Sequence, residues 1–273
     1  MKLRIIAGPC QHESLGQSAE IAKECKNICE QYGIEYIFKA SYDKANRTNI
    51  NGERGVGMDA TLQDFRALKG QYNIKTLTDV HDVMQVKSIS NLYNDAVDVI
   101  QIPAFLCRQT DLIKAACQTN KIVNIKKGQF LSPWDVTGIL SKTKGAVEVW
   151  ITERGTSFGY GRLINDFTGM WDLVSNLGGR FVYDVTHSAQ LPGAKGTSSG
   201  GNREYVPHLA RAGSALGISS FFLEVHPNPD SAPSDGPNML HLKDFKNVVR
   251  DIVDYKYAEK ETTPIDRNFK GFS

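Results

Sequence analysis

Eight short apolar runs, spread along the whole chain, constrain the fold more than any other feature of the sequence. Most are rich in Val, Ile, Leu, Phe and Tyr, and they show no full alternation of apolar and polar residues. Parallel strands have this pattern when both of their faces are buried against other elements. The runs cover residues 3–7, 36–39, 75–79, 97–102, 122–126, 147–152, 181–185 and 220–225.

Stretches with helical spacing lie between most of these runs. In residues 18–32, for example, Ile21, Cys25 and Ile28 fall on one face of a helix. Alternating strands and helices predict a closed (β/α)8 barrel built as one domain from residues 1–258. An open doubly wound sheet is the alternative, but the even spacing and the lack of a Gly-x-Gly-x-x-Gly fingerprint favour the barrel. The expected helices cover residues 18–32, 59–69, 110–119, 133–141, 206–216 and 242–255.

Composition excludes several classes of protein. The 273 residues are 41% hydrophobic, which suits one large domain with a core that needs no disulfides. The formal net charge of +2 indicates neither a nucleic acid nor an anionic membrane as partner. Five cysteines without a Cys-x-x-Cys pair, together with no signal peptide and no long apolar run, predict a cytoplasmic protein with reduced thiols. The polar tail, residues 259–273, is expected to be poorly ordered.

Almost every predicted strand is followed by a side chain capable of chemistry. The carboxyl ends of barrel strands form the active-site mouth, so these side chains are expected to converge there. Strands often end in polar residues simply because loops begin there. That explanation fails for Lys39 and Lys126, which directly end apolar runs where an unpaired charge is costly. The strand-end residues are Cys10, Lys39, Asp79, Gln101, Lys126, Arg154, His187 and Glu224.

Basic residues form the first candidate constellation. Arginine binds phosphate or carboxylate as a planar bidentate donor, and lysine binds them as a compact charge. Several cations around one mouth repel each other unless anions fill it, which predicts phosphorylated substrates. Three long loops rich in Gly, Ser and Pro, residues 41–57, 188–203 and 227–239, are expected to close over a ligand. The basic residues are Lys39, Lys44, Arg47, Lys126, Arg154 and, more distantly, Arg108.

A second constellation has the chemistry of a metal site. Cys10, His187, Glu224 and Asp235 come from the first, seventh and eighth units, which become neighbours when a barrel closes. One thiolate, one imidazole and two carboxylates suit Fe²⁺, Zn²⁺ or Mn²⁺ better than Mg²⁺. Taken singly, the same residues also fit a small buried cysteine, a hydrogen-bonded core histidine and a turn aspartate.

The residues that follow the predicted strands resemble the signatures of the 3-deoxy-D-manno-octulosonate 8-phosphate synthases. The resemblance runs from about residue 5 to residue 255. It rests on Phe38-Lys-Ala-Ser-Tyr-Asp-Lys-Ala-Asn-Arg47, Thr78-Asp-Val-His81, Gln101-Ile-Pro-Ala-Phe-Leu-Cys-Arg-Gln-Thr-Asp111, Asn124-Ile-Lys-Lys-Gly-Gln-Phe130, Glu153-Arg-Gly155, Phe158-Gly-Tyr160 and Asp184-Val-Thr-His187.

The resemblance implies an activity and a set of partners. The implied reaction condenses phosphoenolpyruvate with D-arabinose 5-phosphate, releases inorganic phosphate and serves lipopolysaccharide biosynthesis. A homotetramer is implied too, with Arg108 supplied by a neighbouring subunit. Catalytic roles are implied for Lys44, Asn46, Asp79 and His187. For phosphoenolpyruvate, the implied phosphate contacts are Lys126, Arg154 and the backbone at Ala104, and the implied carboxylate contacts are Lys39, Ser41 and Lys44. For the sugar, Asn46, Arg47 and Thr48 are implied to bind its phosphate, and Asp79, His81 and Ser199 are implied to lie along it. Gln101 is implied as a further substrate contact.

The same resemblance bears on the metal. The family has a metal-dependent branch with Cys in Ala-Gly-Pro-Cys and a metal-independent branch with Asn there, so Cys10 resembles the dependent branch. Two positions depart from the family pattern. Thr48 replaces the usual Ser but keeps a hydroxyl group. The segment Ser234-Asp-Gly-Pro237 combines a Ser typical of the dependent branch with an Asp-Gly-Pro typical of the other.

Three other functions are compatible with parts of this sequence. A 3-deoxy-D-arabino-heptulosonate 7-phosphate synthase tends to carry Lys-Pro-Arg-Thr where this chain has Lys44-Ala-Asn-Arg47, which disfavours it. A metal-dependent barrel hydrolase would need several histidine ligands, often as His-x-His, and no such motif occurs. A non-catalytic sugar-phosphate sensor would need no metal ligands.

Overall fold

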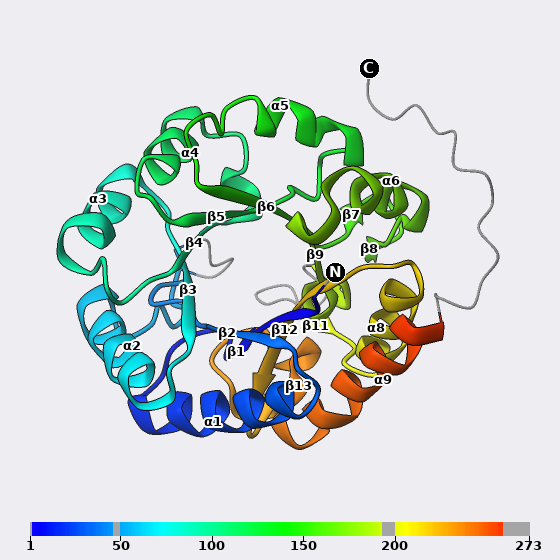
Figure 1. Ribbon diagram of the computed structural model, residues 1–273, viewed down its shortest axis with the longest axis horizontal. Coiled ribbons are helices and arrows are strands. Elements are labelled where there is room, and N and C mark those ends of the chain that lie inside the picture. Colours follow the sequence, from blue (N-terminus) through cyan, green and yellow to red (C-terminus); the bar gives the residue numbers. More distant parts are fainter. Residues whose placement is uncertain (1, 46–49, 193–199, 259–273) are drawn as a thin grey trace.

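A closed barrel of eight parallel strands, surrounded by helices, forms the molecule (Figure 1). The structure is a computed structural model that describes residues 2–45, 50–192 and 200–258. β1 pairs with β2 on one side and with β12 on the other, which closes the sheet and confirms the predicted barrel over the open alternative. The barrel strands, in their spatial order, are β1 (Arg4–Gly8), β2 (Glu35–Lys39), β3 (Lys75–Asp79), β4 (Val99–Ile102), β5 (Ile122–Lys126), β6 (Glu148–Glu153), β9 (Phe181–Asp184) and β12 (Ser220–His226).

The predicted strands agree with the observed ones to within two residues at each end. The runs at residues 75–79 and 122–126 coincide with β3 and β5. Long apolar runs identified these strands well because both faces are buried, one inside the barrel and one under the helices. The polar tail at 259–273 lies outside the described residues.

The helices cover the outside of the barrel. They are α1 (Leu15–Gln31), α2 (Met58–Tyr72), α3 (Val83–Leu92), α4 (Thr110–Cys117), α5 (Val136–Leu140), α6 (Phe167–Leu177), α7 (Val185–Ser188), α8 (Tyr205–Ala215) and α9 (Phe245–Ala258). The sequence pattern missed α3 and α6. Only Val86 and Ile89 of α3 are buried, so its apolar stripe is short. In α6, Gly169 lies inside the helix, because a side chain there would meet Pro133.

Two apolar layers hold the barrel together. The outer and larger layer packs the helices against the strands. The inner layer fills the barrel with one fully buried side chain from nearly every strand, in the manner of barrels that form a packed core and no pore. The inner side chains are Ile6, Ile37, Leu77, Val99, Trp150, Val182 and Phe222.

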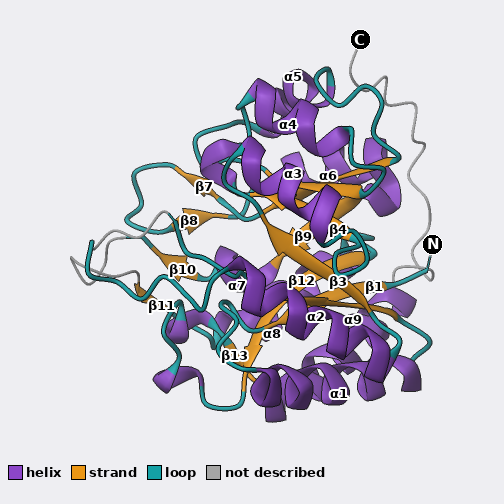
Figure 2. Cartoon of the chain, turned by 90° about the vertical axis from the view of Figure 1, so that its left-hand side faces the viewer, coloured by secondary structure: helices purple, strands orange, loops and turns teal. Residues whose placement is uncertain are grey.

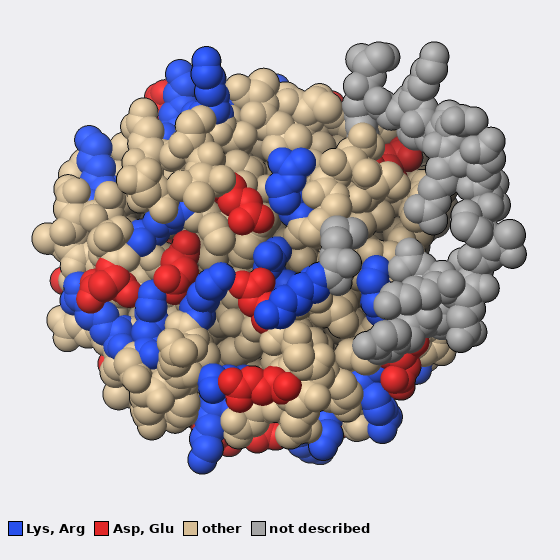
Figure 3. All heavy atoms as spheres, viewed as in Figure 1, with Lys and Arg blue, Asp and Glu red and all other residues tan. Residues whose placement is uncertain are grey.

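Charged side chains close the end of the barrel where the strands begin. The guanidinium of Arg4 lies 4.0 Å from the centre of the Trp150 ring, and its Nε donates to Glu35 over 2.9 Å. Lys75 pairs with the other oxygen of Glu35 at 2.7 Å. Cationic and anionic side chains are interspersed over this face, which Figure 3 shows. This end therefore serves stability, as expected for the amino-terminal face of a barrel.

Short strand pairs lie at the opposite end of the barrel, where the strands end, on the left of Figure 2. One is the hairpin of β7 (Thr156–Ser157) and β8 (Leu163–Ile164). Another is the pair β10 (Gln190–Leu191) and β11 (Gly200–Gly201), and β13 (Leu240–His241) adds to β12. These elements belong to the long loops that follow the strands, so the elaborated end is the mouth of the barrel.

No helix in the described ranges is long and apolar enough to span a membrane. All five cysteines are buried free thiols, in agreement with the predicted reduced state.

Replacement of Trp150 tests the packed interior. Trp150 is fully buried, and Trp150→Ala is expected to lower the free energy of unfolding by about 3–5 kcal/mol through lost burial and a residual cavity. Urea denaturation followed by circular dichroism measures this change. Trp134, which is 49% exposed, provides the matched control, and Trp134→Ala is expected to cost less than about 1 kcal/mol. Equal losses in both variants would contradict the packed barrel interior.

Candidate active site

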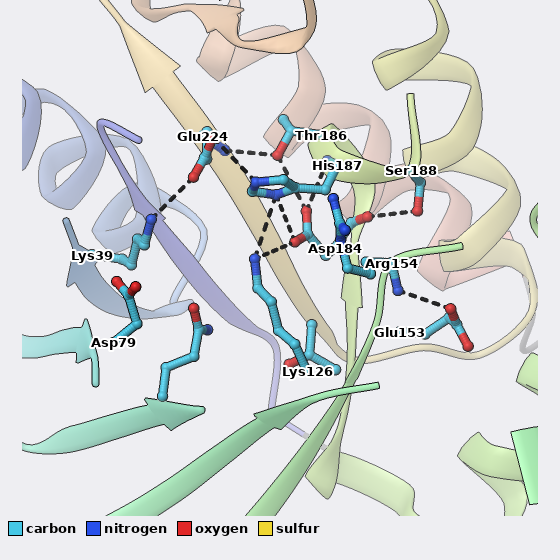
Figure 4. A network of polar contacts seen from close by, with 12 residues as sticks. Lys39, Asp79, Lys126, Glu153, Arg154, Asp184, Thr186, His187, Ser188 and Glu224 are labelled. Atoms are coloured by element: carbon cyan, nitrogen blue, oxygen red, sulfur yellow. Dashed lines mark hydrogen bonds and ion pairs between the residues drawn. The ribbon is translucent and has the colours of Figure 1, made fainter. Parts of the chain in front are cut away.

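Buried charges of both signs meet at the mouth of the barrel (Figure 4). Lys39 at the end of β2 pairs with Glu224 of β12 at 3.0 Å, and both side chains are almost completely buried. Lys126 at the end of β5 pairs with Asp184 of β9 at 2.7 Å. These pairs explain how two lysines can end apolar strands. Such concentrations of buried ionisable groups mark functional sites more often than structural ones.

The four predicted metal ligands come together. Donor atoms of Cys10, Glu224 and Asp235 all lie within 4.8 Å of one another. His187 Nε2 lies 3.6 Å from Glu224 Oε2 and 3.7 Å from Asp235 Oδ2. Within the described part of the chain, the buried Oε2 atom of Glu224 has no hydrogen-bond partner. An orphaned carboxylate oxygen beside a thiol and an imidazole fits a bound divalent cation, and we call these four residues the ligand group.

A close approach of β1 and β2 places Cys10. A Cβ atom at Gly8 would lie 1.9 Å from the carbonyl oxygen of Lys39, so only glycine allows the strands to meet here. Lys39 Nζ then donates to the carbonyl oxygen of Cys10 over 3.0 Å. The Ala-Gly-Pro-Cys segment therefore fixes Cys10 beside the Lys39–Glu224 pair.

Asp184 orients His187. One carboxylate oxygen of Asp184 accepts from the backbone N–H of His187 at 3.0 Å and caps the short helix α7. The other lies 2.8 Å from His187 Nδ1. This contact places the proton on Nδ1 and leaves Nε2 facing Glu224 and Asp235 as a potential ligand atom. The sequence analysis assigned Asp184 no role of its own, although an acid that ends an apolar run three residues before a histidine was a usable signal.

The charges of the ligand group influence one another strongly. Burial, followed by the carboxylates of Glu224 and Asp235, raises the pKa of Cys10 to about 12. Cys10 is therefore a neutral thiol, and its Sγ donates to Asp235 Oδ2 over 3.3 Å. Burial alone would raise the pKa of Glu224 and of Asp235, but the nearby His187, together with neighbouring lysines, holds both pKa values below their usual range. A cation that binds here would take the place of the thiol proton.

Lys126 and Arg154, which we call the basic pair, lie beside the ligand group, and Lys126 Nζ lies 3.4 Å from His187 Nδ1. The ammonium group of Lys126 lies 4.1 Å from the centre of the Phe222 ring, so an aromatic face forms the floor beneath it. Burial lowers the pKa of Lys126, while Asp184 opposes this shift. Arg154 is 7% exposed, and its buried Nε has no hydrogen-bond partner among the described residues. A cation with an unused buried donor is suited to bind an anion.

A third buried ion pair, between Lys127 and Glu153, anchors the backbone next to the basic pair. Lys127 is fully buried, and its Nζ lies 3.4 Å from Glu153 Oε2 and donates to the carbonyl oxygen of Leu131 at 2.8 Å. The other oxygen of Glu153 accepts from the backbone N–H groups of Arg154 and Gly155. Lys127 and Glu153 directly adjoin Lys126 and Arg154 in sequence, so the anchor fixes the backbone that carries both. The sequence analysis missed this pair, although Glu153 ends β6 and Lys127 directly follows β5, because it assigned the ends of these strands to Lys126 and Arg154.

Ser41, Lys44, Asp79 and His81 form a third group. Ser41 Oγ donates to Asp79 and accepts from Lys44 Nζ at 3.0 Å. His81 Nε2 lies 3.2 Å from Asp79 Oδ2. Burial alone would raise the pKa of Asp79, but His81, Lys44 and Lys39 outweigh it and hold that pKa well below its usual value. A charged, hydrogen-bonded acid therefore faces the mouth.

The remaining predicted site residues fall into two sets. Gln101 is buried and donates to Asn124 within the barrel wall at 3.0 Å, while Ala104 opens a short 3₁₀ turn after β4. Arg108 is exposed on the surface. Four predicted residues lie outside the described part of the chain, namely Asn46, Arg47, Thr48 and Ser199.

This barrel and its acidic and basic mouth agree with the comparison to protein families. The chain belongs to the DAHP synthetase I family, whose model matches residues 1–260.

Individual relatives carry a more particular name. A protein of Rhodopseudomonas palustris (strain BisB5), named 2-dehydro-3-deoxyphosphooctonate aldolase, is 47% identical over 263 residues, which cover 96% of this chain and 90% of that protein. A protein of Caulobacter vibrioides (strain NA1000 / CB15N) with the same name is 48% identical over 261 residues, or 95% of this chain and 89% of that protein. The family resemblance predicted from the strand-end motifs is confirmed.

The Asp79–His81 contact predicts a pH dependence. Burial alone would lower the pKa of His81, but its hydrogen bond to Asp79 outweighs this effect and raises the pKa above 6.5. The stability from protonated His81 is therefore fully present below about pH 6.5 and is lost as the pH rises through the folded-state pKa. Urea denaturation between pH 5.5 and about pH 8.5 should show that His81→Gln destabilises the protein most at the acidic end. His208→Gln, at an exposed site, should show no such trend, and a constant loss at His81 would contradict the assignment.

The buried anchor predicts a large effect on stability. Lys127→Met leaves Glu153 buried without its cation, and we expect a loss of about 3–5 kcal/mol in the free energy of unfolding. The double variant Lys127→Met/Glu153→Gln should recover much of this loss, because the uncompensated charge is gone. Lys26→Met removes a lysine from a more exposed pair and should cost less than about 1 kcal/mol. A small loss at Lys127, or no recovery, would argue against the anchor.

Proposed function

We propose that this chain catalyses the condensation of phosphoenolpyruvate with D-arabinose 5-phosphate and water to give 3-deoxy-D-manno-octulosonate 8-phosphate and inorganic phosphate. One observation carries the proposal. Buried cations and a group of potential metal ligands face one another at the mouth of a barrel whose relatives are named 2-dehydro-3-deoxyphosphooctonate aldolase. A site that holds two phosphorylated substrates needs such cations to offset the repulsion between them.

The basic pair would hold the phosphate of phosphoenolpyruvate, together with the backbone at Ala104. Support comes from the buried, unpartnered Nε of Arg154 and from Lys126 at the floor of the site. Lys39, Ser41 and Lys44 would hold the carboxylate.

The sugar would occupy the space beside these residues. Asp79 and His81 would contact it, with Gln101 and Ser199 as further contacts, and Asn46, Arg47 and Thr48 would bind its phosphate. We assign catalytic roles to Lys44, Asn46, Asp79 and His187, as the resemblance implies.

The chemistry follows from the charges of the reactants. C3 of the enol phosphate attacks the aldehyde carbon of the sugar, a carbon–carbon bond forms, and the aldehyde oxygen takes a proton. Positive character develops at C2, where water adds and loses a proton. The C2–O bond to the phosphate then breaks, the C2 hydroxyl passes its proton to the departing phosphate, and a ketone and inorganic phosphate remain. Lys126 and Arg154 stabilise the phosphate as its negative charge increases on departure.

Cys10, His187, Glu224 and Asp235 would hold a divalent metal ion. Their mixed sulfur, nitrogen and oxygen donors favour Fe²⁺, Zn²⁺ or Mn²⁺. When bound, such an ion orients a carbonyl or a water molecule and polarises it as a Lewis acid. The orphaned Oε2 atom of Glu224 supports a ligand at this position.

We further propose a cytoplasmic homotetramer that acts in lipopolysaccharide biosynthesis, with Arg108 reaching the site of a neighbouring subunit. Exposed aromatic side chains on the loops after β4, β5 and β6 support an interface at the mouth. Phe105, Phe130, Phe158 and Tyr160 are 56–74% exposed, and the last two rings stack on each other. Large apolar side chains exposed in this way are costly on an isolated subunit.

A phosphate-release assay tests the reaction. Phosphoenolpyruvate with arabinose 5-phosphate should release inorganic phosphate, at a rate about tenfold or more above that with erythrose 4-phosphate, because the longer aldose alone satisfies all polar contacts of the site. Preference for erythrose 4-phosphate would favour the rival heptulosonate synthase. Binding of both substrates without phosphate release would favour a non-catalytic sensor.

Cys10→Ala tests the metal. Cobalt-loaded wild-type protein should show a thiolate-to-metal charge-transfer band, and Cys10→Ala should lose the band together with most of its metal affinity. Cys117→Ala is the matched control, because this buried cysteine lies on α4 away from the ligand group, and it should keep both. Full activity of Cys10→Ala in the presence of excess chelator would contradict a role of the metal ion in the reaction.

A further inference from the structure

Gln190 joins Arg154 of the basic pair to Asp235 of the ligand group. Gln190 in β10 accepts a hydrogen bond from Arg154 Nη2 through its Oε1 atom at 2.8 Å. Its Nε2 atom donates to Asp235 Oδ1 at 2.9 Å. Gln190 is 8% exposed, so both contacts are shielded from water. Among the residues that the structure describes, only Gln190 forms hydrogen bonds to the side chains of both Arg154 and Asp235.

The chemistry of the two partners fixes the orientation of the Gln190 amide. A guanidinium has only donors, so it requires the carbonyl oxygen of the amide. An ionised carboxylate has only acceptors, so it requires the amide nitrogen. The observed contacts meet both requirements, with Oε1 at 2.8 Å from Arg154 Nη2 and Nε2 at 2.9 Å from Asp235 Oδ1. The amide therefore has one satisfactory orientation, and a flipped amide would lose both hydrogen bonds.

Each contact also decides which atom of the partner stays available. With Oδ1 of Asp235 engaged by Gln190, Oδ2 is the oxygen that faces Cys10 and His187. With Nη2 of Arg154 engaged, Nε is the buried donor without a partner among the described residues. Gln190 thus presents one carboxylate oxygen to a cation and one guanidinium edge to an anion.

The backbone holds Gln190 in place. Gln190 pairs with Gly201 in the antiparallel ladder of β10 and β11, and the N–H of Asn202 donates to the carbonyl oxygen of Ala189 at 3.1 Å. Helix α7, which carries His187, ends at the residue before Ala189. Backbone hydrogen bonds therefore fix the segment from which the Gln190 side chain reaches Arg154 and Asp235.

We propose that Gln190 is a positioning residue that sets the geometry of the metal ligand Asp235 and of the anion-binding Arg154 at the same time. The role rests on the proposed function, because it assumes a cation in the ligand group and a phosphate on the basic pair. Hydrogen bonds from a residue that does not itself bind the metal orient ligating carboxylates, and the loss of such a bond lowers metal affinity about 10- to 100-fold. Loss of the bond to Arg154 costs roughly three- to tenfold in anion affinity.

Two binding measurements on Gln190→Met test the role. Methionine has a similar length but offers neither the donor nor the acceptor. Equilibrium dialysis of phosphate-free protein against Mn²⁺ should show about tenfold weaker binding. Calorimetric titration of metal-free protein with inorganic phosphate should show roughly three- to tenfold weaker binding. A shift in the absorption bands of the Co²⁺-loaded protein should accompany these losses, because Asp235 can then present both oxygens to the ion.

The control is Gln118→Met, the same substitution at an exposed glutamine after α4, which should change none of these readouts. Loss of affinity for only one of the two ions, or for neither, in a folded Gln190→Met protein would overturn the joint role. If thermal unfolding shows that this variant is not folded, the same binding measurements on Gln190→Asn test the role. Its shorter amide cannot reach both partners, so the same double loss is expected, and unchanged affinities would overturn the role.

The proposed function can fail separately. Wild-type protein that binds Mn²⁺ and phosphate and releases phosphate from phosphoenolpyruvate, beside an unaffected Gln190→Met, would overturn the role of Gln190 alone. Wild-type protein that binds neither ion would overturn the proposed metal and phosphate sites and the role of Gln190 with them.

Discussion

The mouth of the barrel depends on lysines that are paired with carboxylates in the protein interior. Lys39 and Lys126 end strands whose other residues are apolar, and each has a carboxylate within 3.0 Å, from Glu224 and Asp184. Removing four charges from water costs more than such pairs usually return, so they stabilise the fold little. Their value is chemical, because they keep cations and carboxylates fixed in a site that does not need to reorganise during the reaction.

Asp184 connects these charges to the rest of the site. It pairs with Lys126, holds His187 Nδ1 and caps the helix that carries His187. Gln190 adds a second link, between Arg154 and Asp235. The region that would bind phosphate and the region that would bind metal therefore share their supporting hydrogen bonds.

The strand pattern predicted the barrel because burial on both faces leaves long apolar runs. Helices were harder to predict where the apolar stripe is short, as in α3, or interrupted by glycine, as in α6. Within the site, the strand-end rule found Cys10, Lys39 and Lys126, but it assigned no role to Asp184 or Gln190. It did not find Lys127 and Glu153, because these two residues come into contact only when β5 and β6 pair in the folded protein.

The sequence by itself determined the fold class, the row of strand-end residues and the resemblance that gives the substrates, because these depend on periodicity and on local motifs. The tertiary structure alone decided which charges pair with which. Glu224 lies 185 residues from Lys39, and Asp235 lies 45 residues from Gln190, so no local pattern relates the members of either pair. Closure of β1 onto β12 brings Glu224 to Lys39, and the pairing of β9 with β12 brings the loops of Gln190 and Asp235 together. The cost of burying a polar or charged group without a partner then selects the contacts.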